Sequence, residues 1–224
     1  MKIVMIGDSI VGNAADGQGG LAKALAPHID LHAVGVGGST VANWLHASGY
    51  DGPGRGYVMG RWGSGSRMAP LTHEECHRAY LPSLMEIESG AWWLNFGTND
   101  RNSGRPAKMW VDQAMAMLEI VPAERVVWTM GNDIPHHRAW RQDALPALQS
   151  LANKRWPGRV LVIGGKSRAY RRGQVHPRVS SHTAWLKSNL ERIETHLTEI
   201  ERRVALQKAL KFLAAIFWAI GGFR

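Results

Sequence analysis

Short apolar runs alternate with longer helical segments along this chain, and this alternation limits its fold more than any other feature. Five runs have the length and apolar content of buried strands: residues 2–6, 29–35, 91–96, 125–130 and 159–163. Helical periodicity is found between and after them: residues 17–26, 72–88, 106–120, 137–155 and 180 onward. Strands that alternate with helices form parallel sheets covered by helices, so we predict an α/β domain. A chain of 224 residues can bury a substantial core in such a domain.

Polar residues follow two of these apolar runs. Ser9 comes after the first run, and Asn99 comes after the third. Serine needs a general base to act as a nucleophile near neutral pH, and His176, just before the last helix, is the candidate base. The Asn99 amide and backbone N–H groups beside glycines can stabilise an oxyanion. Each segment alone is also typical of a turn or a helix start, but their joint order at strand ends favours a catalytic site.

Four short blocks in this order resemble the SGNH (GDSL-type) hydrolase family. They are Gly7-Asp8-Ser9, Gly37-Gly38-Ser39-Thr40, Gly97-Thr98-Asn99-Asp100 and Val175-His176-Pro177. The resemblance covers roughly residues 1–195, and the ordered set is far more specific than any single block. It implies a three-layer α/β/α sandwich around a flavodoxin-like, parallel five-stranded sheet.

The resemblance also implies a reaction. Ser9 would be the nucleophile and His176 the base, while the N–H groups of Ser9 and Gly38 and the side chain of Asn99 would form the oxyanion hole. The chemistry would be ester hydrolysis through an acyl-enzyme, without a metal or cofactor. The family's substrates include lipids, small acyl esters and O-acetylated glycans, so we expect an acyl ester or an O-acylated glycan.

The sequence departs from the family pattern at two positions. Gly173 stands three residues before His176, where the family usually has an aspartate that orients the imidazole, and Ala33 replaces a common asparagine. A backbone carbonyl, or a carboxylate such as Asp133 or Asp143, are alternatives for holding His176. Another alternative is a catalytically weak or inactive protein that serves as a structural or binding component of a larger assembly, such as a phage tail.

A glycine-rich stretch between residues 49 and 67 predicts a long loop rather than regular structure. Two interpretations stay open, a cover over the active site and a surface insertion. Candidate substrate contacts are Trp62 in this stretch, Asp8 beside the nucleophile and Arg172 shortly before His176. Trp44 and Trp140 fit either a sugar-stacking surface or the core.

Two other motifs predict no further chemistry. His73 and His77 with Glu74 fit the HExxH pattern of zinc proteases, but no third ligand follows at a familiar spacing, and Thr72 with Glu75 explains the segment as a capping box. Residues 165–167 end like a phosphate-binding loop, but Val160 stands where that loop needs glycine. We therefore expect no metal site and no nucleotide site.

Charge and targeting signals limit which binding partners and which location we expect for the protein. The formal net charge is +9, with the excess in the second half of the chain, but no nucleic-acid-binding motif accompanies it, so nucleic acid is not an expected partner. The single cysteine, Cys76, excludes an intramolecular disulfide. Lys2 leads directly into the first strand without a signal peptide, so we expect a cytoplasmic protein, or a virion-associated one if a phage encodes it.

The C-terminal segment extends beyond the family's usual boundary. Apolar residues repeat at heptad spacing from Leu186 to Val204, and a second repeat runs from Leu206 to Ile220. We therefore predict an SGNH-like domain over residues 1–198 and a hydrophobic, basic helix over residues 199–224. Homo-oligomerisation through this helix is the favoured interpretation, and contact with a membrane surface or a virion is the alternative.

Overall fold

The computed structural model describes residues 2–12, 20–46, 56–60, 67–71, 84–87, 89–122, 125–130, 138–164 and 180–198. The chain divides into two compact units, Met1–Ser188 and Asn189–Arg224. The first unit contains the sheet and the candidate site.

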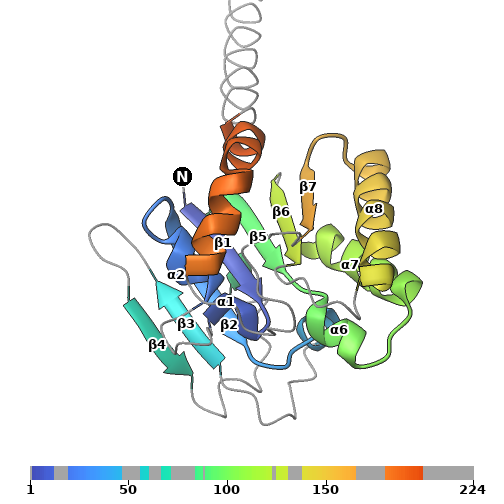
Figure 1. Cartoon of the computed structure of the whole chain (residues 1–224), viewed down its shortest axis with the longest axis horizontal. Helices are drawn as coiled ribbons and strands as arrows, with labels where there is room; N and C mark the ends of the chain where they lie inside the picture. Colours follow the sequence, from blue (N-terminus) through green and yellow to red (C-terminus); the bar gives the residue numbers. More distant parts are fainter. Residues whose placement is uncertain are drawn as a thin grey trace, which may run out of the picture. The chain divides into compact units, whose positions relative to one another are not determined.

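The sheet has seven strands in the order β4-β3-β2-β1-β5-β6-β7 (Figure 1). Its parallel strands are β1 (Lys2–Gly7), β2 (Asp30–Val36), β5 (Ala91–Asn95), β6 (Val126–Met130) and β7 (Val160–Gly164). Numbered among themselves, these five follow the order 2-1-3-4-5, which is the flavodoxin-like order. The prediction of a parallel five-stranded sheet at these positions is confirmed.

Two further strands extend the sheet beyond β2. β3 (Gly56–Gly60) pairs antiparallel with β2, and β4 (Arg67–Leu71) pairs antiparallel with β3. The prediction of a loop over residues 49–67 was wrong for β3 and for the first residue of β4, because strand formation depends on a partner edge as well as on local propensity. The edge of β2 supplies backbone partners to Tyr57-Val58-Met59, and the glycines stand at the two ends of β3.

Helices follow the strands of the first unit as the alternation predicts. They are α1 (Ser9–Gly12), α2 (Leu21–Leu25), α3 (Val41–Leu45), α6 (Thr98–Asn102), α7 (Ala107–Ile120) and α8 (Arg138–Arg155). A last described helix spans residues 180–198 and runs from the first unit into the second. The long helices α7 and α8 begin and end within one residue of the predicted bounds. The short helices α1, α3 and α6 were not predicted, because a single turn carries no periodic signal.

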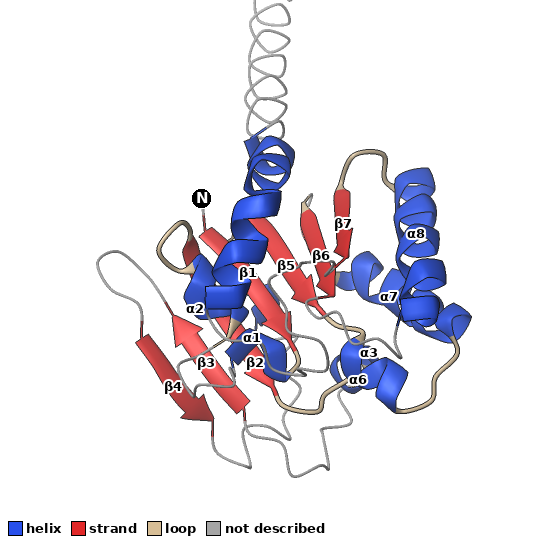
Figure 2. Ribbon diagram, in the orientation of Figure 1, coloured by secondary structure: helices blue, strands red, loops and turns tan. Residues whose placement is uncertain are grey.

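Alternate strand residues pack into two different layers. Val4, Trp92 and Trp128 belong to the core cluster that also contains residues of α3, α7 and α8. Their neighbours Met5 and Trp93 are equally buried and point to the opposite face, because successive side chains of a strand alternate. Helices α1 and α2 contact β2 there. The result is the predicted three-layer α/β/α arrangement, whose elements can be followed in Figure 2.

Aromatic rings form a continuous row through the core beneath α3, α7 and α8. The row runs Trp44, Phe96, Trp128, Trp110, Trp140, with centroid separations of 5.9, 6.1, 5.6 and 5.1 Å. Such pairs each contribute about 0.5–1.5 kcal/mol beyond the burial of their area. Trp44 is only 5% exposed, and the Trp140 indole N–H donates to the Arg105 carbonyl. Both tryptophans therefore belong to the core rather than to a sugar-stacking surface.

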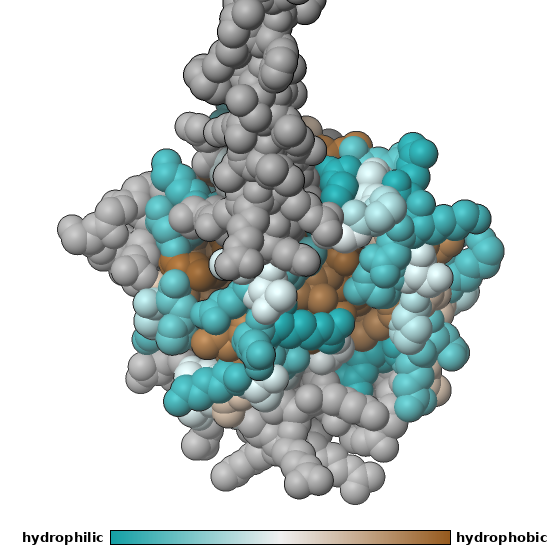
Figure 3. Space-filling view, turned by 90° about the horizontal axis from the view of Figure 1, so that it is seen from above, coloured by the Kyte–Doolittle hydropathy of each residue, from teal (hydrophilic) through white to brown (hydrophobic). Residues whose placement is uncertain are grey.

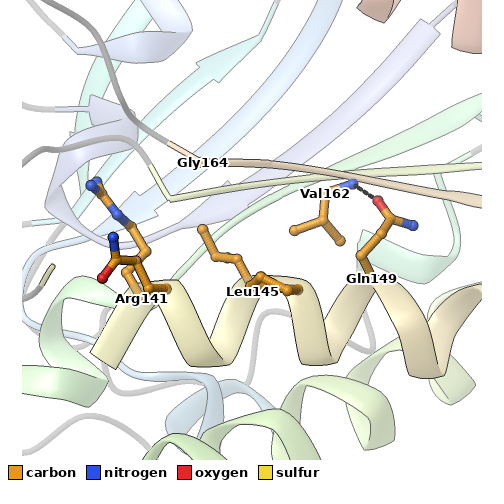
Figure 4. A pocket seen from close by; sticks show the side chains of 7 residues that line it. Arg141, Leu145, Gln149, Val162 and Gly164 are labelled. Carbon is orange, nitrogen blue, oxygen red and sulfur yellow. Dashed lines mark hydrogen bonds between the residues drawn. The ribbon is translucent and has the colours of Figure 1, made fainter. Parts of the chain in front are cut away.

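A side chain of α8 covers the edge of β7, the last strand in the sheet order. Gln149 Nε2 donates to the Val160 carbonyl at 2.9 Å. Gln149 Oε1 accepts from the Val162 N–H at 2.7 Å (Figure 4). A pocket of about 440 Å³ lies beside this contact, with Arg141, Leu145 and Gly164 in its wall (Figure 4). The amide therefore pairs with the strand edge as a neighbouring backbone would.

The face of the molecule seen from above is mostly hydrophilic, with apolar residues among the hydrophilic ones (Figure 3). Among the described residues, no helix combines the length and apolar character needed to cross a bilayer. Within residues 180–198, Leu186, Ile193 and Leu197 of the predicted heptad are buried and Leu190 is half-buried. Residues 199–224 lie outside the described residues.

Candidate active site

Three segments that are far apart in the sequence meet at one end of the sheet. Ser9 begins α1 directly after β1, the Gly37-Gly38 turn joins β2 to α3, and Asn99 lies in α6 after β5. Because β1 is the neighbour of both β2 and β5, and all three are parallel, their carboxyl ends lie side by side. The short helices α3 and α6 are adjacent at this end (Figure 2). The structure therefore brings three of the four predicted blocks together.

The turn that carries Ser9 is held tightly against β5. The Asp8 N–H donates to the Asn95 carbonyl at 3.3 Å, and a Cβ added to Gly7 would lie only 2.5 Å from that same carbonyl oxygen. Only glycine permits this approach. Asp8 then caps α1, since its Oδ1 accepts the Ile10 N–H at 2.9 Å. Ser9 follows the cap at the carboxyl end of the sheet and is half-buried.

The turn after β2 is fixed by its own hydrogen bonds. Gly38 has φ +79°, a conformation that favours glycine. The Ser39 hydroxyl donates to the Val36 carbonyl at 2.7 Å. Thr40 and Asn43 form a capping box at the start of α3, with Asn43 Oδ1 accepting from the Thr40 N–H at 2.9 Å. These bonds hold the Gly38 N–H in one place.

Helix α6 clamps this turn through two neighbouring side chains. Asn99 Nδ2 donates to the Ser39 carbonyl at 3.0 Å, and Asp100 Oδ1 accepts the Val41 N–H at 3.2 Å. Arg105 Nη1 donates to the same Asp100 oxygen at 3.1 Å and pairs with its charge. An asparagine amide has two N–H donors, so one can hold Ser39 while the other serves a ligand.

Two buried carboxyl groups lie beneath the site. Burial raises the pKa of Asp8 to about 7, opposed by the Ile10 N–H; the charge of Asp100 raises it further, and the Asn95 amide lowers it. Burial also raises the pKa of Asp100 to about 6, against the Val41 N–H and Arg105, which lower it. Only 1% of Asp8 is exposed. This placement gives Asp8 a structural setting rather than that of the predicted substrate contact.

The remaining predicted site residues are His176, Trp62 and Arg172, and they lie outside the described residues, as do Gly173 and Asp133. The HExxH segment at residues 73–77 does so too. Asp143, one alternative partner for His176, is exposed on α8. Within the described ranges, no group of three or more His, Cys, Asp or Glu side chains could hold a metal ion.

Sequence reasoning missed three residues that support the site from below. Asn95 and Thr129 are buried polar residues in β5 and β6, and Trp93 donates to Thr129. The available signal was a polar residue inside an otherwise apolar strand. Such residues need buried partners, and the sequence does not show which partners they find.

Comparison with known proteins gives a fold and no family. No protein-family model matches the chain, and no curated protein matches it. Among solved structures, the salicylyl-acyltransferase SsfX3 from a tetracycline biosynthetic pathway has a TM-score of 0.53 and 15% identity, over 84% of this chain and 52% of its own. TesA has a TM-score of 0.53 and 16% identity, over 88% of this chain and 99% of its own. A DUF4886 family protein from Bacteroides uniformis has a TM-score of 0.52 and 12% identity, over 89% and 83%.

These likenesses support the three-layer α/β/α fold. The chain spans about half the length of SsfX3, and nearly all of TesA.

Proposed function

We propose that the protein is a serine ester hydrolase of the SGNH (GDSL) type. The main support for this proposal is that the segments with Ser9, Gly38 and Asn99 lie together at one end of the sheet. Asn99 is hydrogen-bonded to the turn that contains Gly38. A nucleophile, a backbone N–H in a glycine turn and a side-chain amide are groups that acyl transfer uses, together with a general base, for which His176 is the candidate. The same three segments are three of the four blocks that carry the sequence resemblance.

In the proposed reaction, Ser9 Oγ attacks the carbonyl carbon of an ester. The N–H groups of Ser9 and Gly38 and the Asn99 amide stabilise the oxyanion of the tetrahedral intermediate. His176 takes the serine proton and returns it to the leaving alcohol, and water then releases the acyl group. In the sequence, His176 follows β7. The strands β1, β5 and β7 are parallel, so their carboxyl ends lie at the same end of the sheet.

Acyl chemistry is also supported by one structural likeness. SsfX3 is described as a salicylyl-acyltransferase, and transfer to an alcohol and hydrolysis by water share the acyl-enzyme step. The proposed substrates are therefore acyl esters, including O-acylated glycans. No metal or cofactor enters this mechanism.

Hydrolysis of a short-chain nitrophenyl ester tests the proposal. The wild-type protein is compared with Ser9→Ala and with Ser150→Ala, an exposed serine on α8. We expect Ser9→Ala to lose at least about 10³-fold in kcat, because the acyl-enzyme cannot form, and Ser150→Ala to keep the wild-type rate. Equal turnover by Ser9→Ala and wild type, with both folded, would reject the serine mechanism. It would favour the alternative of a binding or structural component.

A further inference from the structure

A chain of buried polar side chains leads across the sheet to the turn that carries Ser9. Trp93 Nε1 donates to Thr129 Oγ1 at 2.8 Å, and Thr129 Oγ1 donates to Asn95 Oδ1 at 2.9 Å. Asn95 Nδ2 donates to Asp8 Oδ1 at 3.4 Å. Each of these four residues is at most 1% exposed. The chain lies on the α1 and α2 side of the sheet, opposite the aromatic row.

The direction of every hydrogen bond in this chain follows from its first member. An indole N–H can only donate, so Thr129 must accept from Trp93 and turn its own proton elsewhere. The Asn95 amide oxygen accepts the hydrogen bond that the Thr129 hydroxyl donates. This contact orients the amide so that its NH₂ group faces Asp8. The opposite orientation would place the Asn95 oxygen against the Asp8 carboxylate, which repels it. The indole of β5 thus determines the orientation of an amide two residues further along.

Asp8 in turn connects the chain to the nucleophile. Its Oδ1 accepts both the Asn95 amide and the Ile10 N–H, while its own N–H donates to the Asn95 carbonyl. Asn95 therefore holds Asp8 by backbone and side chain together, on the residue just before Ser9. The second oxygen, Asp8 Oδ2, is buried and has no hydrogen-bond partner among the described residues. The ionised carboxyl thus depends on the two donors at Oδ1.

We infer that Trp93, Thr129 and Asn95 form a positioning chain that orients the Asp8 carboxylate and, through it, the turn that presents Ser9. The statement about Ser9 rests on the proposed function, whereas the statement about Asp8 does not. Energetics favour a positioning role for these polar side chains over simple filling of the core. A buried hydrogen bond contributes only about 0.5–1.5 kcal/mol net, and apolar side chains of the same shape would fill the layer about as well.

The decisive pair of variants is Thr129→Val and Thr129→Ser. Valine keeps the shape of threonine and loses the hydroxyl, whereas serine keeps the hydroxyl and loses a methyl group. If the hydroxyl orients Asn95, the valine variant releases the amide and the serine variant retains it. If Thr129 only fills space, the order of the two variants reverses.

The first readout is the ionisation of Asp8, followed by carbon-13 NMR of its carboxyl group across pH. Loss of an oriented N–H donor disfavours the charged form, so we expect Thr129→Val to raise the Asp8 pKa by about half a unit or more. Thr129→Ser should leave it close to the wild-type value. Asp100, whose charge raises the Asp8 pKa, and its partner Arg105 are unchanged in both variants.

The second readout is turnover of the nitrophenyl ester. We expect Thr129→Val to lower kcat about tenfold with KM little changed, because the serine is misplaced while substrate binding is not. Trp93→Phe, which removes the first donor, should act in the same direction. Trp128→Phe is its matched control, since Trp128 is equally buried in a strand and its indole nitrogen has no partner among the described residues.

The outcomes separate the two proposals. An unchanged Asp8 pKa in folded Thr129→Val would overturn the positioning chain. A raised pKa with undiminished turnover would overturn its effect on Ser9. If the wild-type protein has no esterase activity, the proposed function fails, and the NMR titration still decides whether the chain orients Asp8. A raised pKa with reduced kcat, spared in Thr129→Ser, would support the whole inference.

Discussion

Single residues at the end of β1 decide how closely the turn that carries Ser9 approaches β5. Gly7 leaves no room for a side chain, because a Cβ would meet the Asn95 carbonyl oxygen at 2.5 Å and Val11 Cγ2 at 2.6 Å. Gly35 on β2 is similar, with Val11 Cβ at 2.9 Å. Glycine at these two positions is required by packing rather than by backbone conformation, since neither has a positive φ.

Gly7→Ala tests this close approach. We expect it to lower the free energy of unfolding by about 3 kcal/mol, because the backbone must move to admit the methyl group. Gly104→Ala is the control, since Gly104 has φ +77° but no atom within 4 Å of an added Cβ. That variant should lose only about 1–2 kcal/mol from backbone strain. Urea unfolding of both variants measures the difference, and similar losses would contradict the explanation.

Ionisation of Asp8 makes the stability of the folded protein depend on pH. Its pKa is about 7 in the folded protein and 3.8 in an unfolded chain, so the folded protein binds more protons between these values. Stability therefore falls as pH rises from about 4 to about 7, where the buried carboxyl must ionise. Asp100 contributes in the same sense, with a folded pKa of about 6.

Asp8→Asn should reduce this dependence, because an amide does not ionise. We expect the variant to gain stability relative to wild type as pH rises from 4 to 8, leaving the smaller slope due to Asp100. Thermal unfolding across pH is the measurement. Asp112→Asn is the control, since Asp112 is exposed on α7 beside Lys108. Parallel curves for wild type and Asp8→Asn would show that Asp8 does not titrate in this range.

At the scale of elements, the position of each strand in the sheet determines what protects it. Within the described residues, β7 has a strand partner on one side only, and Gln149 of α8 supplies hydrogen bonds on the other. Unpaired strand edges promote association between molecules. The Gln149 side chain therefore holds α8 against β7 and also blocks pairing of β7 with a strand of another molecule.

Gln149→Glu tests the edge contact. A carboxylate can still accept the Val162 N–H, but it cannot donate to the Val160 carbonyl, so we expect a loss of about 1–3 kcal/mol at neutral pH. The loss should shrink below about pH 4, where a protonated carboxyl can donate again. Gln142→Glu, exposed on the same helix, is the control. Denaturant unfolding at both pH values is the measurement, and a loss independent of pH would argue against the contact.

For the whole molecule, we propose that the helical pattern beyond residue 198 mediates self-association. Its heptad spacing favours helix pairing, and the buried seam residues at 186, 193 and 197 precede it. Light scattering of the full chain and of a chain ending at residue 198 measures the effect. We expect the oligomer to fall to a monomer on truncation while ester turnover persists. An oligomer of unchanged mass would rule out this use of the segment, and binding of the full chain alone to lipid vesicles would favour the membrane alternative.

The sequence by itself determined the five parallel strands, the long helices α7 and α8 and the candidates Ser9, Gly38 and Asn99. These depend on local patterns: apolar runs become strands, and glycine, serine and asparagine at their ends form turns. Only the tertiary structure decided the rest. β3 forms because β2 offers it a strand edge to pair with. The Asn95 NH₂ group faces Asp8 because Thr129, 34 residues from Asn95 in the sequence, donates to the Asn95 oxygen and accepts from the Trp93 indole. Pairing between distant residues depends on how the strands are arranged in space, and no local pattern encodes that arrangement.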